Sequence, residues 1–196
     1  MDSTATAERF AADTWRTMGV IESPGARPLA RRLFGAQSVV RSHAQALAKV
    51  QPHAGRPRVV VPANLNAAVA HWQIGHAIAD WLLRHDGLDD EGVLPIRSGL
   101  AAAIVLPREQ IVDYSDLSAE EIAHALTLPV AATLLREAEV SRVPTALVVP
   151  GRYTRVRGDD AGRLPRDAAA LEYLAAHRAI GVVRTVVPEG VVLRLR

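Results

Sequence analysis

The residues best placed to do chemistry are Trp72, Gln73 and His76, which fall on one predicted helix. Side chains four apart on a helix point into the same space, so two histidines at positions 72 and 76 could bind one zinc ion. A glutamate at position 73 would then act as a general base toward the metal-bound water. Indole is not a metal ligand, and a carboxamide cannot accept a proton near neutral pH. His76 is therefore the only retained ligand position, and we predict no catalytic residues and no bound metal.

A metal site rebuilt from other residues is the alternative. Asp80, four residues after His76, together with His71 or His85 is the only local set of ligands. His71 lies about 140° from His76 around the helix, because each residue advances about 100°. The two imidazoles therefore cannot share a metal without distortion, and we favour a helix that holds none. An active zinc peptidase with relocated ligands remains the less favoured possibility.

The helix that carries these residues is the clearest element in the sequence. It is predicted over residues 67–85, after Asn64 or Asn66 as its N-terminal cap. Its apolar stripe consists of Ala70, Ile74, Ile78, Trp81 and Leu82. Trp72, His76 and Asp80 fall on another face, where an indole indicates that this side is also partly covered.

The remaining pattern predicts an α+β fold. Residues 37–50 are ambiguous between a strand and a helix, because Val39 and Val40 favour the first and Ala44 to Val50 the second. Ser118 and Glu121 have the spacing of a capping box. Further helices are predicted over 5–18, 28–34, 98–106, 118–126, 130–139 and 167–179. Strands are predicted over 58–62, 145–149, 153–156, 182–187 and 191–195.

Composition narrows the function classes. The 196 residues are 49% hydrophobic, which is enough for a core without metal or disulfide support. Zero cysteines exclude thiol nucleophiles, cysteine-bound zinc and a disulfide framework. The first residues show no secretion signal and no run is long enough to cross a membrane, so we expect a cytoplasmic protein without a membrane partner. A net charge of +2 is too small for general attraction to polyanions.

The order of the motifs resembles the ImmA/IrrE zinc metallopeptidases, which are regulatory peptidases of bacteria and their mobile elements. A short strand at Val59-Val60-Val61 precedes the helix segment His71-Trp72-Gln73-Ile74-Gly75-His76, which aligns with the family's "AHELGH". Residues 100–107, Leu-Ala-Ala-Ala-Ile-Val-Leu-Pro, then resemble "FAAxLLMP". The capped helix that begins after Ser118, with Pro129-Val130, resembles the helical pair that follows in the family.

The resemblance implies a fold but does not imply catalytic activity. It implies a mostly helical, zincin-like core with a small β-sheet over residues 1–140, which includes a helix-turn-helix-like pair at 118–139. Residues 141–196 form an unmatched extension of hairpin, helix and hairpin. The family's third zinc ligand, a glutamate, has no counterpart in residues 93–97, and Glu91 is two or three residues out of register.

The expected function is that of a pseudo-peptidase, which regulates a phage or another mobile element by binding a protein or peptide partner. The cleft of such a protein would be lined by Trp72, Gln73, His76 and Asp80.

A winged-helix DNA-binding regulator is the other reading. The helix pair at 118–139 and the hairpin at 145–157 have the outline of a DNA-reading module. Its phosphate contacts would come from Arg136, Arg152, Arg155 and Arg157. The second helix of the pair offers one arginine and no Asn, Gln or Lys to read base edges, which argues against this reading. The terminal hairpin could also bind an acidic partner through Arg184, Arg194 and Arg196.

Overall fold

The protein is an α+β chain of two compact units, Met1–Asp113 and Tyr114–Arg196. The computed structural model describes residues 3–19, 25–149, 152–158, 164–165, 167–177, 179 and 181–195. The sequence placed a boundary after residue 140, whereas the compact units divide between Asp113 and Tyr114. The helical pair of 118–139 therefore belongs with the C-terminal strands. Within the described ranges, no helix combines the length and apolar character that a membrane span requires.

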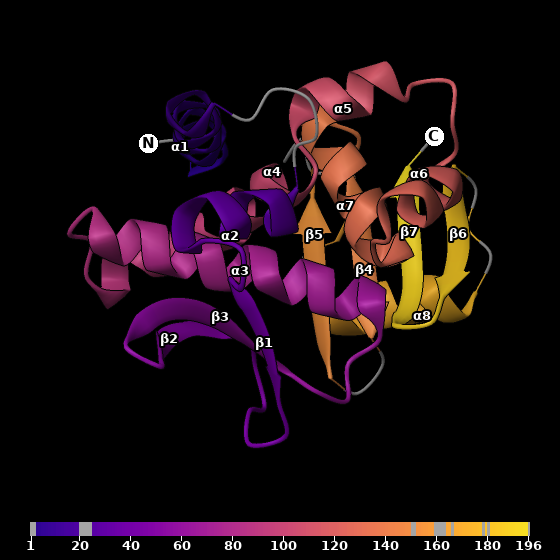
Figure 1. Cartoon of the computed structure of the whole chain (residues 1–196). Coiled ribbons are helices and arrows are strands. Elements are labelled where there is room, and N and C mark those ends of the chain that lie inside the picture. The colour runs from indigo at the N-terminus through magenta and orange to yellow at the C-terminus, as the bar shows by residue number, and fades with distance from the viewer. Residues whose placement is uncertain are drawn as a thin grey trace. The chain divides into compact units, whose positions relative to one another are not determined.

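The first unit contains five helices and one small sheet within its described residues. Its helices are α1 (Ser3–Met18), α2 (Ala26–Phe34), α3 (Ala67–His85), α4 (Asp90–Val105) and α5 (Arg108–Asp113). Its strands are β1 (Val39–Ser42), β2 (Lys49–His53) and β3 (Arg56–Pro62), in the order β1-β3-β2. β1 runs parallel to β3, and β2 runs antiparallel to it. Figure 1 shows α2 and α3 on the same side of this sheet.

α3 forms where the sequence predicts it, with Asn66 as its cap. The Asn66 side chain accepts a hydrogen bond from the Val69 N–H at 2.8 Å, which satisfies one of the free donors of the first turn. Ile74 and Ile78 on the predicted apolar stripe are fully buried. α4 packs along α3, and Gly75 lies at a close approach of the two helices, where a Cβ atom would overlap Val105 Cγ2.

Two helices of this unit differ from the sequence prediction, and the segment that the sequence left ambiguous is now assigned. α4 begins at Asp90 rather than residue 98, because the Asp89 side chain accepts from the Gly92 N–H at 2.9 Å and caps a longer helix. Residues 44–50 do not form a helix, since β2 begins at Lys49 and pairs with β3. The turn between these strands, Ala54 and Gly55, has φ values of 51° and 77°, as a type I′ hairpin requires. The short helix α5 was not anticipated.

The second unit wraps helices around an antiparallel sheet. Its helices are α6 (Ala119–Leu126), α7 (Val130–Ser141) and α8 (Ala168–Ala176). Its strands are β4 (Thr145–Val149), β5 (Tyr153–Arg157), β6 (Val182–Val187) and β7 (Gly190–Leu195), in the order β5-β4-β7-β6. The predicted capping box is confirmed, since Ser118 Oγ accepts from the Glu121 N–H and the Glu121 carboxylate accepts from the Ser118 N–H.

Helices cover both faces of this sheet, because alternate residues of the strands face opposite layers. Leu147, Val187 and Val192 pack against Ala131, Leu134 and Leu135 of α7. Ala146, Val148 and Leu193 pack on the other face with Leu171 and Ala175 of α8. The sheet is thus the middle layer of the unit (Figure 1).

Candidate functional site

Three of the four predicted site residues, Trp72, His76 and Asp80, lie along one stripe of α3. Arg84 continues this line, and we call the four residues the 72–84 stripe. Trp72, His76 and Asp80 are half-buried, whereas Arg84 is exposed. The Trp72 and His76 rings meet edge to face, with centroids 5.3 Å apart and planes at 73°. The spacing of four therefore brings positions 72 and 76 together, as the sequence predicts.

Gln73, at the position of the general base, is bonded to the backbone. Its Oε1 accepts a hydrogen bond from the Ala48 N–H at 2.9 Å, just before β2 begins. This contact ties the middle of α3 to the start of a strand. The carboxamide thus holds the backbone in place, and it has no basic group to receive a proton.

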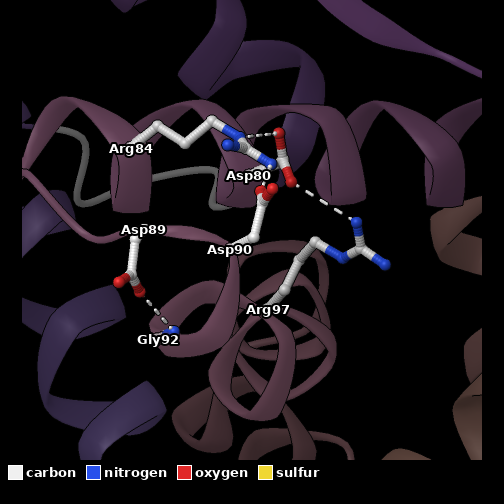
Figure 2. A network of polar contacts seen from close by, with 6 residues as sticks. All are labelled: Asp80, Arg84, Asp89, Asp90, Gly92 and Arg97. Carbon is white, nitrogen blue, oxygen red and sulfur yellow. Dashed lines mark hydrogen bonds and ion pairs between the residues drawn. The ribbon is translucent and has the colours of Figure 1, made fainter.

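Asp80 lies at the centre of a charged network that joins α3 to α4 (Figure 2). Its carboxylate accepts hydrogen bonds from Arg84 Nε at 2.9 Å and from Arg97 Nη1 at 3.3 Å. Arg84 also donates to Asp90 at 2.7 Å. The hydrogen bonds to Asp80 and then to Asp90 raise the pKa of Arg84 above its ordinary value. Two guanidinium groups therefore hold the Asp80 carboxylate.

This donor set does not fit a zinc ion. His76 is the only imidazole on the stripe, Gln73 is bonded to Ala48, and Asp80 is paired with arginines. The other candidate histidines do not converge on His76. The His85 ring stacks on Trp81 with centroids 5.0 Å apart, and His71 lies beside Gly25 at the start of α2. Over the described ranges, no group of three or more His, Cys, Asp or Glu side chains could hold a metal.

Two of the four arginines predicted to contact nucleic acid form ion pairs within the second unit. Arg136 is 1% exposed and bonds to Glu139 at 3.4 Å, so it is not presented to a partner, contrary to the prediction. Arg157 pairs with the same carboxylate at 2.6 Å. Arg152 is exposed and Arg155 is half-buried.

α7 is largely buried, because its buried residues fall on all sides of the helix. Its buried residues are Ala131, Ala132, Thr133, Leu134, Leu135, Arg136 and Ala138. In the terminal hairpin, Arg194 pairs with Glu137 of α7 at 2.9 Å, and Arg184 donates to the carbonyl oxygen of Ala175. Arg196 lies outside the described residues.

The sequence reading missed the partners of Asp80. Arg84 follows Asp80 at the helix spacing of ion pairs, so the pattern alone could have identified it. Arg97 could not be placed, because its helix was expected to begin one residue later, at 98, and therefore had no assigned face toward α3.

Comparison with known proteins gives one likeness at the level of the fold. No protein-family model matches the chain, and no curated protein matches it. A solved structure described as a "Mycobacterium tuberculosis transcriptional regulator" is similar, with 19% identity and a TM-score of 0.54. The likeness covers 100% of this chain and 88% of that chain. Both units therefore share their fold with the regulator.

Proposed function

We propose that this protein is a catalytically inactive, ImmA/IrrE-like regulatory protein that acts by binding a protein or peptide partner. The proposal rests on the contacts made by the side chains of α3 at positions 72, 73 and 80. Trp72 replaces a ligand, Gln73 is bonded to Ala48, and two arginines hold Asp80. Of the side chains at these positions, one cannot bind a metal and two are engaged in hydrogen bonds with other parts of the first unit.

The retained parts of the motif support the proposed zincin-like core. A buried strand, β3, leads into α3, and α4 packs along it. Gly75 keeps its place in the motif, and here it allows α4 to approach. The description of the structural neighbour as a transcriptional regulator supports a regulatory role. On the basis of the family resemblance, the proposed role is the regulation of a phage or another mobile element, and the proposed location is the cytoplasm.

Trp72 and His76 are the residues proposed to contact the partner. A half-buried indole offers a large, rigid contact area at low entropic cost, and aromatic residues dominate the binding energy of many interfaces. The neighbouring imidazole adds a polar group to the same surface.

Two measurements on the full chain test the proposal. Fluorescently labelled casein incubated with the zinc-supplemented protein should stay intact, and cleavage that disappears in His76→Ala would overturn the proposal. Peptides selected from a random display library on the wild-type chain should bind more weakly to Trp72→Ala, by about tenfold or more. Tyr173→Ala, which removes a 63% exposed aromatic side chain from α8, is the matched control and should bind normally. Equal loss in both variants, or in neither, would also contradict the proposal.

Direct DNA binding is the second candidate, favoured by the description of the structural neighbour and by exposed Arg152 beside β5. Phosphate contacts release counterions, so such binding would weaken steeply as salt rises. The test is fluorescence anisotropy of labelled duplex DNA across a salt series, with the double variant Arg152→Ala and Arg155→Ala. Salt-dependent binding lost in this variant would favour the second candidate over the first.

A further inference from the structure

The sheet of the second unit has two edge strands, which differ in their number of charged residues. β5 and β6 are the outermost strands, and β6 reads Val-Val-Arg-Thr-Val-Val over residues 182–187. Among the described strands, only β7 pairs with β6. Val186 is 78% exposed, although its neighbour Val187 is buried. A β-branched edge strand with an exposed apolar side chain is a template for pairing with another strand.

The one charged side chain of β6 does not protect the open edge of this strand against pairing. Edge strands usually resist pairing through charged side chains that project from them. Arg184 is the only charged residue of β6, and its guanidinium instead donates to the carbonyl oxygen of Ala175, in the last turn of α8. A cation at this end of a helix also interacts favourably with the helix dipole. β5, at the other edge, carries two arginines, of which Arg157 pairs with Glu139 and Arg155 is half-buried.

The backbone of β6 is arranged to accept a strand at particular residues. Val182 and Leu195 face one another, but the Val182 N–H bonds to Ala179 at 3.3 Å and the Leu195 N–H to Pro144 at 3.1 Å. This pair is therefore a non-hydrogen-bonded one. Because the two kinds of pair alternate in an antiparallel ladder, Arg184 and Val186 also turn their N–H and C=O groups away from β7.

We propose that β6 is the interface between two copies of this chain, which join antiparallel through this edge to form one continuous eight-stranded sheet. A hydrogen-bonded pair across the new boundary must use residues 184 and 186. A two-fold axis at Thr185 satisfies this requirement, since it places Arg184 opposite Val186 of the second copy. It also places Thr185 opposite Thr185 and Val183 opposite Val187, so that no like charges face one another.

The sequence of β6 and its pairing register both favour a second copy of this chain as the partner strand. When β6 is reversed about Thr185, Val183 meets Val187 and Thr185 meets its own copy, so most of the facing side chains are alike and uncharged. Threonine pairs and pairs of β-branched residues across strands are favourable. An axis at Arg184 would set two arginines opposite each other, which costs stability.

The first test is the mass of the full chain in solution, measured by light scattering and sedimentation across a wide range of concentration. The wild type should form a discrete dimer. Val186→Lys should raise the dimer dissociation constant by about tenfold or more, because it adds a charge at the boundary opposite Arg184. Val186 is exposed, so the variant should keep the wild-type circular dichroism spectrum. Tyr173→Lys, which adds the same charge on α8, is the matched control and should remain dimeric.

The second test reads the register directly, because the chain contains no cysteine. Thr185→Cys should give a disulfide-linked dimer on mild oxidation, since a non-hydrogen-bonded pair brings the two Cα atoms to about 4.5 Å. Tyr173→Cys is the control and should crosslink far less. A wild type that is monomeric at all concentrations, a dimer insensitive to Val186→Lys, or equal crosslinking at positions 173 and 185 would each overturn the proposal.

Discussion

At the scale of single residues, Gly75 sets how closely α3 and α4 approach. A methyl group at this position would overlap Val105 Cγ2 and lie 3.3 Å from the Ala101 carbonyl oxygen. The first atom belongs to a buried side chain and the second to backbone, so neither moves easily. The substitution would therefore push the helices apart.

We predict that Gly75→Ala destabilises the first unit. Overpacking of a core costs about 1–3 kcal/mol, and the better helix propensity of alanine returns at most about 1 kcal/mol. Tryptophan fluorescence during urea denaturation will measure the loss, because all three tryptophans lie in this unit. Gly99→Ala, whose added methyl group would meet only Ala7 Cβ at 3.1 Å, should cost less. A Gly75→Ala variant as stable as the wild type would contradict the packing.

The closeness of positions 72 and 76 gives a second prediction at this scale. Trp72→His should create a pair of imidazoles at the spacing that binds zinc, because the two rings already meet. Saturating zinc should then raise the melting temperature of the variant, with a stabilisation of about 2.7 kcal/mol when zinc is present at 100 times its dissociation constant.

The shift should be absent in the wild type and in the double variant Trp72→His, His76→Ala. A zinc-induced shift that survives the loss of His76 would show that the metal binds elsewhere.

At the scale of elements, the N-terminus of α6 should make stability depend on pH. Hydrogen bonds from the Ser118 backbone and side chain lower the pKa of Glu121 below its ordinary value of 4.5. The capping contribution is therefore complete above pH 4.5, and it is lost as the pH falls through the lowered pKa of the folded chain.

Glu121→Gln should consequently be less stable than the wild type at pH 7, and the difference should shrink in acid. Ser118→Ala should cost about 1 kcal/mol at neutral pH. Thermal unfolding at a series of pH values will measure both effects. Glu120→Gln, which removes a neighbouring charge without touching the capping box, should show a smaller difference. A Glu121→Gln deficit that persists unchanged in acid would exclude this origin.

Local signals in the sequence were enough to place most elements and failed where distant residues decide. The capping box, the apolar stripe of α3 and the β-branched runs depend on neighbours in sequence. The structure contains the capping box and the strands, and it buries Ala70, Ile74 and Ile78 of the stripe, whereas Trp81 and Leu82 are half-buried. β2 was missed because its Lys-Val-Gln-Pro-His pattern has little strand character and becomes a strand only by pairing with β3. The pairing of Arg97 with Asp80 depends on how α4 packs, which no local pattern records.

At the scale of the whole molecule, the division into two compact units predicts that a destabilising substitution affects mainly the unit that contains it. Glu139 is 8% exposed and pairs with both Arg136 and Arg157, which links α7 to β5. Removing one partner of a buried ion pair typically costs about 3–5 kcal/mol. Glu139→Gln should therefore destabilise the second unit strongly.

Hydrogen exchange followed by mass spectrometry should show faster exchange in residues 114–196 of Glu139→Gln and little change before residue 113. Glu137→Gln, on the same helix, is the control. It loses a single ion pair with Arg194 that is more exposed to solvent than the pairs of Glu139, and it should cost about 1 kcal/mol or less. Faster exchange throughout the chain would mean that the two units unfold together.

The parallel pairing of β1 with β3 has a consequence for the order of folding. β2 and β3 are joined by a two-residue turn, so their pairing closes a short loop. The pairing of Val39 with Val59 closes a longer loop, which contains the whole of β2. Closing the longer loop costs more chain entropy, so β1 should dock after the hairpin has formed. Val40→Ala is then expected to accelerate unfolding while leaving the refolding rate nearly unchanged, which stopped-flow kinetics would reveal.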